Sequence, residues 1–412
     1  MHILRTISRI LVGLVFIFSG FVKSVDPLGT AYKFGDYFDS FHIEFLSALA
    51  LPLAVILISV EFILGIVLVL NVRIKFFAWG LLFIMSFFFV LTLIIAITNP
   101  VTDCGCFGDF LIISNWETFF KNVVLMGLTI FIFLQKDQYQ VQFIPKVEWA
   151  IAISAAVLVL WFSVHCINHL PIVDFRPYHV GSNIPSKMEI PDDAPIDEYK
   201  ISLIYEKDGI QKEFEVNDPE WQDGTWTFVK RNEELLTEGY VPPIHDFLIL
   251  DSAGYDVTDD ILSNYNYTFL LISHKIDIDK SKYYKEAESI SLFCDQNDQF
   301  SFYAVTSSLQ EDCDKLYDKS GISYPFCSAD DITLKTILRS NPGLVLLKEG
   351  TIINKWHHHD FPDIKEISEY AYADMLNTQR KKMEGNRVWI MGLIVVLISL
   401  SGKIILNKYY SA

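Results

Sequence analysis

Six apolar runs limit what this chain can become, because each is long enough to cross a lipid bilayer as a helix, for which about 20 residues are needed. They cover residues 7–23, 52–71, 75–98, 116–134, 148–167 and 388–407. Arg5 and Arg9 precede the first run, as in a signal peptide, but no small-residue cleavage site follows it and further runs do. The sequence therefore predicts a membrane α-helical bundle whose first helix is retained.

Charge divides the chain into two parts. The formal net charge of the 412 residues is -17. Residues 171–387 hold 40 acidic and 22 basic side chains, whereas the rest of the chain holds 10 and 11. A nearly neutral, apolar part is thus joined to an acidic, water-soluble part. The acidic part has no basic patch with interleaved aromatic residues, so we expect no nucleic-acid partner.

The positive-inside rule predicts the orientation of the spans in a bacterial inner membrane. Basic residues flank alternate ends of the runs, at Arg5, Arg9, Arg73, Lys75, Lys136, Lys146, Lys403 and Lys408. The loop over residues 99–115 contains no Lys or Arg, so we place it and the acidic domain in the periplasm and the N-terminus in the cytoplasm. A basic group at Arg380, Lys381, Lys382 and Arg387 disagrees, but residues beside a long translocated domain weigh less in this rule.

The stretch VTDCGCFGDF, residues 101–110, places Cys104 and Cys106 one glycine apart in this outer loop. Disulfides persist in an oxidising compartment, so the two thiols are candidates for pairing. A fully extended chain puts residues two apart at roughly 6.6–7.2 Å, near the upper limit for a disulfide, so the chain must turn. Gly105 permits that turn. A disulfide in so tight a ring is predicted to exchange with other thiols, rather than to serve as a permanent structural cross-link.

Two alternatives remain for this pair. It is also compatible with a structural staple that tightens the loop. A weaker alternative is that it supplies two ligands of a metal site that His165 and Cys166 complete at the outer end of the fifth span, since four-ligand zinc sites usually present more regular pairs. Redox exchange is the interpretation we favour, and we predict no metal.

The N-terminal third, residues 1–137, resembles the MauE and DoxX group of redox-associated membrane proteins. The resemblance rests on Phe-Ser-Gly-Phe-Val-Lys at 18–23, Glu61 with Gly65, and Asp-Cys-Gly-Cys-Phe-Gly at 103–108. It implies a four-helix bundle active in membrane-linked thiol or quinone redox chemistry, with a quinone as the expected cofactor. It also implies that Cys104 and Cys106 are the redox pair, in a loop shaped by Asp103, Gly105, Phe107 and Gly108.

Glu61 lies well inside the second run. A carboxyl group in hydrocarbon is costly unless it is protonated, paired or turned toward an internal cavity, which makes it a candidate site residue. A neutral acid that hydrogen-bonds a neighbouring helix is an equally good interpretation. Lys23 ends the first run, and we expect it to snorkel to the surface rather than to pair with Glu61.

The soluble part follows a single span at 146–168. Residues 171–239 read as a linker and a hairpin that turns at Lys207-Asp208-Gly209. Residues 240–378 then alternate strands and helices, which predicts an α/β domain. Within 240–262 we expect a strand, a Ser-Ala-Gly turn, a second strand and a short helix. Further strands are expected at 267–273 and 300–307, and a hairpin over 343–356. The other expected helices end near Phe293, cover about 309–319 and run over 363–377. A last span, 388–408, anchors the C-terminus.

The order of elements in 240–378 resembles a thioredoxin-like domain. Pro342 falls where that fold places its cis-proline. A working member carries Cys-x-x-Cys after the first central strand, but SHKIDIDKSK, residues 273–282, contains no cysteine. The resemblance therefore implies a domain that keeps the scaffold, lacks the dithiol and binds or positions a partner.

Four further cysteines and a histidine run complete the candidates. We expect Cys294, Cys313 and Cys327 to be buried thiols, with a Cys313–Cys327 bond as the alternative, and we leave the state of Cys166 open. The three histidines at 357–359 follow an expected strand, and metal binding is one interpretation of them. We favour an exposed polar turn, since neighbours on an extended chain point to opposite faces.

Together these features predict an inner-membrane thiol–disulfide redox protein that exchanges electrons between periplasmic client thiols and the membrane. The alternative is a non-catalytic membrane scaffold whose degenerate thioredoxin-like domain binds a client. The expected partners are the lipid bilayer and a periplasmic client protein.

Overall fold

The computed structural model describes residues 1–101, 103–140, 143–237, 239–364 and 367. The chain divides into two compact units, residues 1–182 together with the chain from 248 onward, and residues 183–247. The predicted span at 388–408 lies outside the described residues. So does almost all of the helix predicted for 363–377.

Within the described residues, five helices are long and apolar enough to cross a membrane. They are α1 (His2–Val25), α3 (Ala50–Leu70), α4 (Ile74–Thr98), α5 (Asn115–Leu134) and α6 (Pro145–Asn168), and they overlap the first five predicted runs. Short 3-10 turns extend or join them at η1 (Glu44–Leu49), η2 (Gly108–Phe110) and η3 (Lys136–Gln138). A multi-pass membrane region is therefore present, as the hydropathy pattern predicts.

Close packing of α1 on α3 organises the bundle. A Cβ atom on Gly65 of α3 would lie 2.5 Å from the backbone nitrogen of Ile17 and 2.8 Å from the carbonyl oxygen of Gly13. Small residues let two membrane helices approach to backbone contact in this way. Leu68 and Leu81 are fully buried in the core that these helices share with α4 and α5. The bundle therefore has a tightly packed side, against which α6 also packs.

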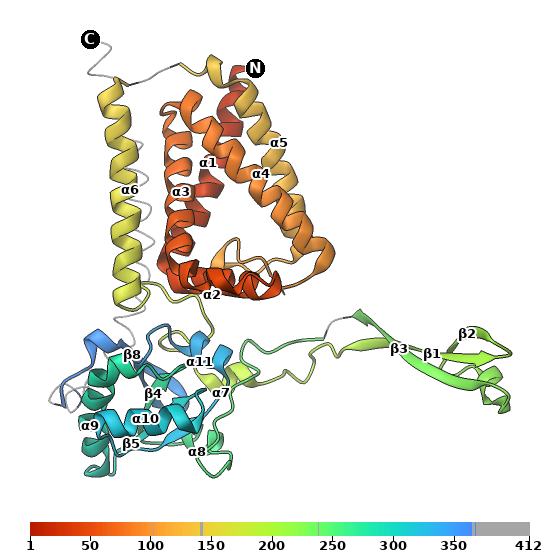
Figure 1. Cartoon of the computed structure of the whole chain (residues 1–412), viewed down its shortest axis with the longest axis vertical. Helices are drawn as coiled ribbons and strands as arrows, with labels where there is room; N and C mark the ends of the chain where they lie inside the picture. The colour runs from red at the N-terminus through yellow and green to blue at the C-terminus, as the bar shows by residue number, and fades with distance from the viewer. Residues whose placement is uncertain (102, 141–142, 238, 365–366, 368–412) are drawn as a thin grey trace. The chain divides into compact units, whose positions relative to one another are not determined.

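Helix α2 (Pro27–Ser40) lies across one end of these helices (Figure 1). The Asp26 carboxylate caps it by accepting the N–H of Gly29, and Pro27 occupies the first turn, where its missing N–H costs nothing. No helix was predicted here, because the segment lies outside the apolar runs. Its position brings polar side chains to the end of the bundle where α4 connects to α5.

The soluble α/β domain is built on a five-stranded sheet in the order β6-β5-β4-β7-β8. Its strands are β4 (Tyr267–Ser273), β5 (Phe300–Thr306), β6 (Phe326–Ser328), β7 (Gly343–Lys348) and β8 (Thr351–His357). β4, β5 and β6 are parallel, whereas β7 and β8 are antiparallel additions. Every residue of the central strand β4 is buried, as expected for a strand covered on both faces.

Helices connect the parallel strands of this sheet. α9 (Ser281–Asp295) links β4 to β5, α10 (Gln310–Ser320) links β5 to β6, and α11 (Asp331–Ile337) precedes β7. Short turns flank them at η5 (Ile278–Lys280) and η6 (His358–Asp360). Strand order, crossover helices and the terminal hairpin are those of a thioredoxin-like domain, which confirms the predicted fold class.

The prediction of two strands on either side of a Ser-Ala-Gly turn within 240–262 was wrong. The structure has only an isolated bridge between Leu250 and Asp256 there, followed by α8 (Thr258–Leu262). The Asp251 carboxylate accepts the backbone N–H groups of Ala253 and Tyr255, each at 2.8 Å. Because this side chain takes up the backbone donors, the segment forms a tight turn instead of a ladder.

The second unit, residues 183–247, is a three-stranded antiparallel sheet in the order β2-β1-β3. It contains α7 (Ile184–Met188), β1 (Glu198–Lys207), β2 (Ile210–Glu215), η4 (Pro219–Asp223) and β3 (Thr227–Thr237). Asp208 and Gly209 both have positive φ, as a two-residue hairpin loop requires. The predicted hairpin is therefore present.

Candidate functional site

The cysteine pair lies in the connection between α4 and α5. Cys104 and Cys106 are half-buried thiols whose Sγ atoms lie 2.6 Å apart. Gly105 turns the chain between them at φ +62°, a conformation that costs glycine little. A Cβ atom there would also lie 3.1 Å from Cγ of Lys33. The predicted turn is present, and it brings the two sulfur atoms together.

Asp103 and helix α2 hold this turn in place. Oδ1 of Asp103 accepts the N–H of Gly105 at 2.8 Å, and Oδ2 accepts Nζ of Lys33 at 2.7 Å. The Tyr37 hydroxyl, one turn further along α2, donates to the carbonyl oxygen of Cys104 at 2.7 Å. Neither Lys33 nor Tyr37 was among the predicted site residues. The Asp-Pro start of α2 is the signal that would have located their helix.

Phe107 and Gly108 close the loop behind the pair. The ring of Phe107 packs edge-on against Phe18 of α1, with centroids 5.5 Å apart, and Nζ of Lys121 lies 4.3 Å from its centroid. Gly108 has φ +53° and donates its N–H to the carbonyl oxygen of Gly105 at 3.1 Å. These two residues therefore shape the loop and attach it to α1.

Glu61 and Lys23 form an ion pair inside the bundle. Nζ of Lys23 lies 2.8 Å from Oε1 of Glu61, and the two side chains are only 5% and 2% exposed. The expectation that Lys23 snorkels to the surface was wrong. The close approach of α1 to α3 places the two side chains opposite each other, and pairing satisfies both charges at this buried site.

Ser19 connects this ion pair to the cysteine loop. Its Oγ lies 2.9 Å from Oε2 of Glu61 and 2.9 Å from the carbonyl oxygen of Cys106. The hydroxyl has one proton, so it donates to one of these oxygens at a time. A short polar path therefore runs from the loop to the interior pair.

A cavity of about 490 Å³ adjoins these groups. Its polar lining includes Cys104, Cys106, Lys23, Glu61 and Asn122. The remaining wall is mostly aliphatic and aromatic, and includes Phe16, Phe34, Leu57, Val60, Phe88 and Leu91. A large apolar space with a few convergent polar groups is the usual form of a small-molecule site.

The two thiols differ in acidity. The hydrogen bond that it shares with Cys106 lowers the pKa of Cys104 to about 6, and Thr118 and the charge of Lys121 add to this against the opposing effect of burial. The same hydrogen bond and burial raise the pKa of Cys106. At neutral pH, Cys104 is therefore the thiolate and Cys106 keeps its proton.

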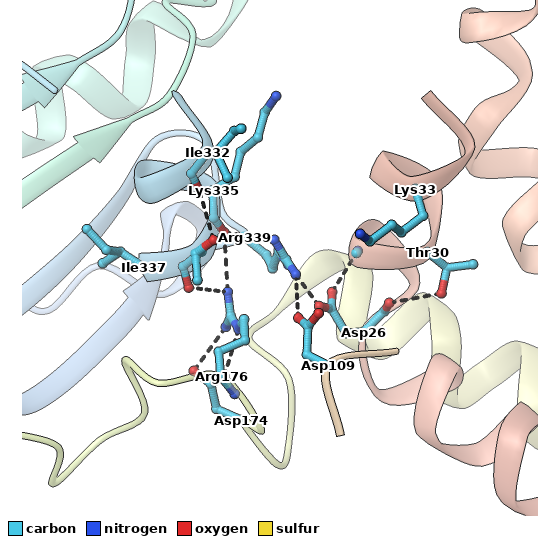
Figure 2. Close-up of polar contacts among 12 residues, drawn as sticks. Asp26, Thr30, Lys33, Asp109, Asp174, Arg176, Ile332, Lys335, Ile337 and Arg339 are labelled. Carbon is cyan, nitrogen blue, oxygen red and sulfur yellow. Dashed lines mark hydrogen bonds and ion pairs between the residues drawn. The ribbon is translucent and has the colours of Figure 1, made fainter. Parts of the chain in front are cut away.

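The Arg339 side chain of the α/β domain binds two carboxylates, one at the start of α2 and one directly after the cysteine loop (Figure 2). Its Nε donates to Oδ2 of Asp26 at 2.8 Å, and its Nη2 donates to Oδ2 of Asp109 at 2.7 Å. Asp26 caps α2, and Asp109 lies in η2 directly after the cysteine loop. One guanidinium group therefore holds together the loop, the capping residue of α2 and the end of α11.

The segment after α6 is fixed to the same domain (Figure 2). Nε of Arg176 donates to Oδ1 of Asp174 at 2.7 Å, and its Nη1 donates to the carbonyl oxygen of Thr336 at 3.1 Å. Nζ of Lys355 also contacts Asp174, at 2.9 Å. Arg176 and Lys355 hold the pKa of Asp174 well below its usual range although burial opposes this. The three side chains form a buried charged network.

The thioredoxin-like domain lacks a dithiol where that fold carries one. His274 follows β4 in that position, and its Nε2 lies 3.3 Å from the Tyr32 hydroxyl of α2. Burial lowers the pKa of His274 to about 4, so the imidazole is neutral at neutral pH. The Asn341–Pro342 peptide bond is cis, as predicted. The scaffold and its cis-proline are therefore present, but His274 faces α2 in place of a thiol.

The other cysteines are buried thiols. Cys294, Cys313 and Cys327 form no disulfide bond. Burial raises the pKa of Cys294 to about 12. The alternative Cys313–Cys327 bond is absent. The alternative metal site with His165 and Cys166 does not form either, since the group of metal-binding side chains found within the described residues lies elsewhere, at residues 357–359.

The prediction of an exposed histidine turn was wrong for two of the three residues. His357 and His358 are buried, at 4% and 7% exposed, and only His359 is exposed. β8 ends at His357 and η6 begins at His358, so the chain curls and the side chains do not alternate as on an extended strand. Burial lowers the pKa of His357 to about 3 and that of His358 to about 4.

These features define a class: a multi-pass membrane protein that carries a thioredoxin-like domain without its dithiol. Residues 1–135 match the family described as Methylamine utilisation protein MauE. The match spans the helical bundle and the cysteine loop. Residues 199–238, in the antiparallel sheet, match a domain of unknown function, DUF8463. No curated protein matches the chain.

Similar solved structures include a protein disulfide isomerase candidate from Bacteroides thetaiotaomicron, at 18% identity and TM-score 0.26 over 31% of this chain and 85% of that chain. A thioredoxin candidate from Neisseria meningitidis aligns at 17% identity and TM-score 0.26 over 32% of this chain and 89% of that chain. At these scores the fold assignment rests instead on the strand order and the cis-proline. The chain therefore joins a MauE-type membrane region to a thioredoxin-like domain.

Proposed function

We propose that the protein is a membrane thiol–disulfide oxidoreductase in which Cys104 and Cys106 cycle between dithiol and disulfide. A client protein's thiols reduce the pair, and a quinone held in the bundle takes up the electrons. One observation carries this proposal: the two sulfur atoms lie 2.6 Å apart at the wall of a cavity of about 490 Å³.

The electrons and protons balance over two half-reactions. A client dithiol attacks the Cys104–Cys106 disulfide through a mixed disulfide, and two electrons pass to the pair as the client disulfide forms. The reduced pair holds one proton on Cys106 Sγ and a thiolate on Cys104. A low thiol pKa stabilises the reduced form and makes the disulfide the stronger oxidant, which favours electron transfer from the client to the cysteine pair.

The cavity fits a quinone in size and chemistry. Its wall supplies aliphatic and aromatic contacts, including Phe88 and Leu91, for a ring and its isoprenoid chain. A quinone bound there would accept the two electrons and the one proton released when the disulfide re-forms, together with a second proton from the cavity wall. Cys106 Sγ carries one proton, and Lys23 Nζ, hydrogen-bonded to Glu61 on the cavity wall, is placed to supply another.

The orientation follows from the charges at the two ends of the bundle. The loop between α4 and α5, which carries the pair, has no Lys or Arg, whereas Arg73 and Lys75 lie at the opposite end of α4. We place the loop and the soluble domain on the periplasmic side of a bacterial inner membrane, with the N-terminus in the cytoplasm. This compartment is oxidising, as the proposed cycle requires.

The thioredoxin-like domain positions the client in this proposal. It lacks a dithiol of its own, and Arg339 attaches it to Asp109 beside the reactive loop. A client bound to this domain is therefore delivered close to Cys104 and Cys106 without an internal electron relay.

Trapping in living cells tests the cysteine step. Changing Cys104 or Cys106 singly to Ser prevents resolution of the mixed disulfide, so we expect one of these variants to accumulate a covalent client adduct that reductant releases. Cys166→Ser is the matched control, since this thiol lies buried in α6 and plays no part in the cycle. Two results together would overturn the proposal: a cysteine pair that is always oxidised, and normal function in the Cys104→Ser/Cys106→Ser variant. They would support the alternative of a non-catalytic scaffold in which the disulfide is structural.

Cavity filling tests the quinone step. In nanodiscs containing a short-chain quinone, reduced protein should re-form its disulfide, and Leu91→Trp should slow this at least tenfold by occupying the cavity. Ile94→Trp, on the same helix but 40% exposed and outside the cavity wall, is the matched control. Equal reoxidation rates in the two variants would exclude a quinone in this cavity.

A further inference from the structure

The histidine cluster, which we define as His357, His358 and His359, lies apart from the cysteine loop. One ring nitrogen from each of its members lies within 4.8 Å of the others. Around a tetrahedral Zn²⁺, with Zn–N bonds of roughly 2.1 Å, such atoms are roughly 3.4 Å apart. The three nitrogens must therefore move closer together, by rotation of the rings, to reach bonding distance of one ion.

Hydrogen bonds to oxygen orient two of these rings for metal binding. Nδ1 of His358 lies 2.8 Å from Oγ of Ser340 and 3.2 Å from the carbonyl oxygen of Pro342. The Ser340 hydroxyl donates its own proton to the Pro342 carbonyl, so its oxygen is left to accept. Nδ1 of His359 lies 3.0 Å from the carbonyl oxygen of Asn168. A carbonyl oxygen only accepts, so each Nδ1 carries the proton and each Nε2 carries the lone pair. Metal-bound histidines are oriented by the same kind of contact.

His169, at the end of α6, shows the same pattern. Its Nδ1 lies 2.8 Å from a carboxylate oxygen of Asp360, and its ring centroid lies 6.3 Å from that of His357. The carboxylate accepts the Nδ1 proton, so Nε2 again carries the lone pair. A carboxylate behind an imidazole raises its basicity as a ligand and adds a negative charge that offsets a bound cation.

His357 is the exception within the cluster. Its Nδ1 accepts the backbone N–H of His359 at 3.2 Å, so it must release this long contact to bind an ion through that atom. The nearby cation, Lys280, donates from Nζ to the carbonyl oxygen of Asn341 at 2.6 Å. That charge opposes a second cation, whereas Asp360 favours one.

We propose that the histidine cluster, with His169 as a fourth ligand, binds one divalent transition-metal ion of the Zn²⁺ type. Neutral imidazole suits zinc, copper and nickel, and a set without thiolate or carboxylate ligands argues against iron–sulfur clusters, calcium and magnesium. The bound ion joins η6 of the thioredoxin-like domain to the last residues of α6. It therefore braces the domain on the membrane helix, independently of Arg339 and of the cysteine pair.

Metal binding to the purified full chain tests the proposal. The protein is prepared without a polyhistidine tag, stripped with a chelator and titrated with Zn²⁺ against a chromophoric competitor. We expect one ion per chain, and the same stoichiometry in Cys104→Ser/Cys106→Ser. Replacing Zn²⁺ by Cu²⁺ should give an electron paramagnetic resonance spectrum with splitting from nitrogen ligands. One ion bound in the wild type but none in the cysteine variant would assign the metal to the thiols and overturn the proposal.

Variants at exposed positions separate binding from folding. His359 is exposed, so His359→Ala should fold and should lose at least tenfold in Zn²⁺ affinity. Asp360→Asn, which removes the carboxylate behind His169, should lose roughly 10–100-fold. His245→Ala, an exposed histidine of the second unit, is the control and should bind as the wild type. Unchanged affinity in both His359→Ala and Asp360→Asn would show that the cluster is not a metal site.

Discussion

Arg339 and Asp109 are 230 positions apart in sequence, yet Nη2 of the arginine donates to the aspartate at 2.7 Å. The arginine is almost fully buried and belongs to the soluble domain, whereas the aspartate lies directly after the cysteine loop of the membrane region. The same guanidinium also holds Asp26, which caps α2. The contact therefore couples the order of the reactive loop to the docking of the soluble domain.

Removing this arginine should loosen the loop. Arg339→Ala leaves two carboxylates without their shared donor, so we expect a loss of roughly 1.5–3 kcal/mol in local stability, the usual range for hydrogen bonds to charged groups. Hydrogen exchange over residues 103–110 and 26–40 should rise. Arg339→Lys should recover only part of the protection, because an ammonium group lacks the planar fork that reaches two carboxylates.

Arg231→Ala is the control for Arg339→Ala. Its ion pair with Glu233 lies on the exposed sheet of the second unit, and such pairs contribute about 0–1 kcal/mol. Exchange in the cysteine loop should be unchanged in this variant. Equal protection of the loop in Arg339→Ala and in the wild type would show that the coupling does not exist.

The acidity of Cys104 should depend on Cys106 through the hydrogen bond that they share. In Cys106→Ala that bond is lost, so the pKa of Cys104 should rise from about 6 toward the ordinary thiol range. In Cys106→Ser a hydroxyl donor remains, so the rise should be smaller. The pH dependence of alkylation measures this, since only the thiolate reacts. An identical midpoint in both variants would rule out the shared hydrogen bond as the cause.

The turn at Gly105 should be required for closure of the disulfide. Gly105→Ala places a Cβ atom at φ +62° and 3.1 Å from Cγ of Lys33, which costs about 1–2 kcal/mol for the left-handed backbone alone. We expect slower disulfide formation, measured by the rate at which free thiols disappear under a mild oxidant. Gly127→Ala, in a helix with open space around it, should leave that rate unchanged. Equal rates in the two variants would contradict the requirement.

Two variants of the buried Lys23–Glu61 ion pair should distinguish its effect on stability from its effect on activity. Lys23→Met alone leaves the Glu61 carboxylate without its cation, and losing one partner of a buried pair costs about 3–5 kcal/mol. Lys23→Met/Glu61→Met replaces both charges by apolar side chains and should regain most of the stability in thermal unfolding. It should nevertheless reoxidise its dithiol slowly, because Lys23 is no longer there to supply the second proton. Normal reoxidation in the double variant would exclude that role for Lys23.

Local sequence determined most of the elements. Hydropathy located the five described membrane helices, since burial in lipid requires about 20 apolar residues in each. Alternation of strands and helices predicted the α/β domain, and Pro342 stood where the cis bond is found. The Cys-Gly-Cys spacing by itself required the turn at Gly105. These features depend on neighbours along the chain, which is why they are legible in one sequence.

Contacts between residues far apart in the chain could not be predicted from the sequence in the same way. Lys23 was expected to snorkel because it ends its own apolar run, whereas its partner Glu61 belongs to a different helix. Lys33 and Tyr37 reach the cysteine loop only because α2 turns across the end of the bundle. The buried histidines were misassigned because the chain curls at η6, where a strand was assumed to continue.

The sequence by itself therefore determined what this chain is made of: apolar membrane helices, an acidic thioredoxin-like domain without a dithiol, and two cysteines in a loop that must turn. Only the tertiary structure decided which charges meet, how one thiol becomes more acidic than the other, and where a cavity opens. The physical reason is the separation along the chain over which each interaction acts. Hydropathy and backbone preference act over a few residues, whereas ion pairs, burial and cavities arise between side chains that folding brings together from distant parts of the chain.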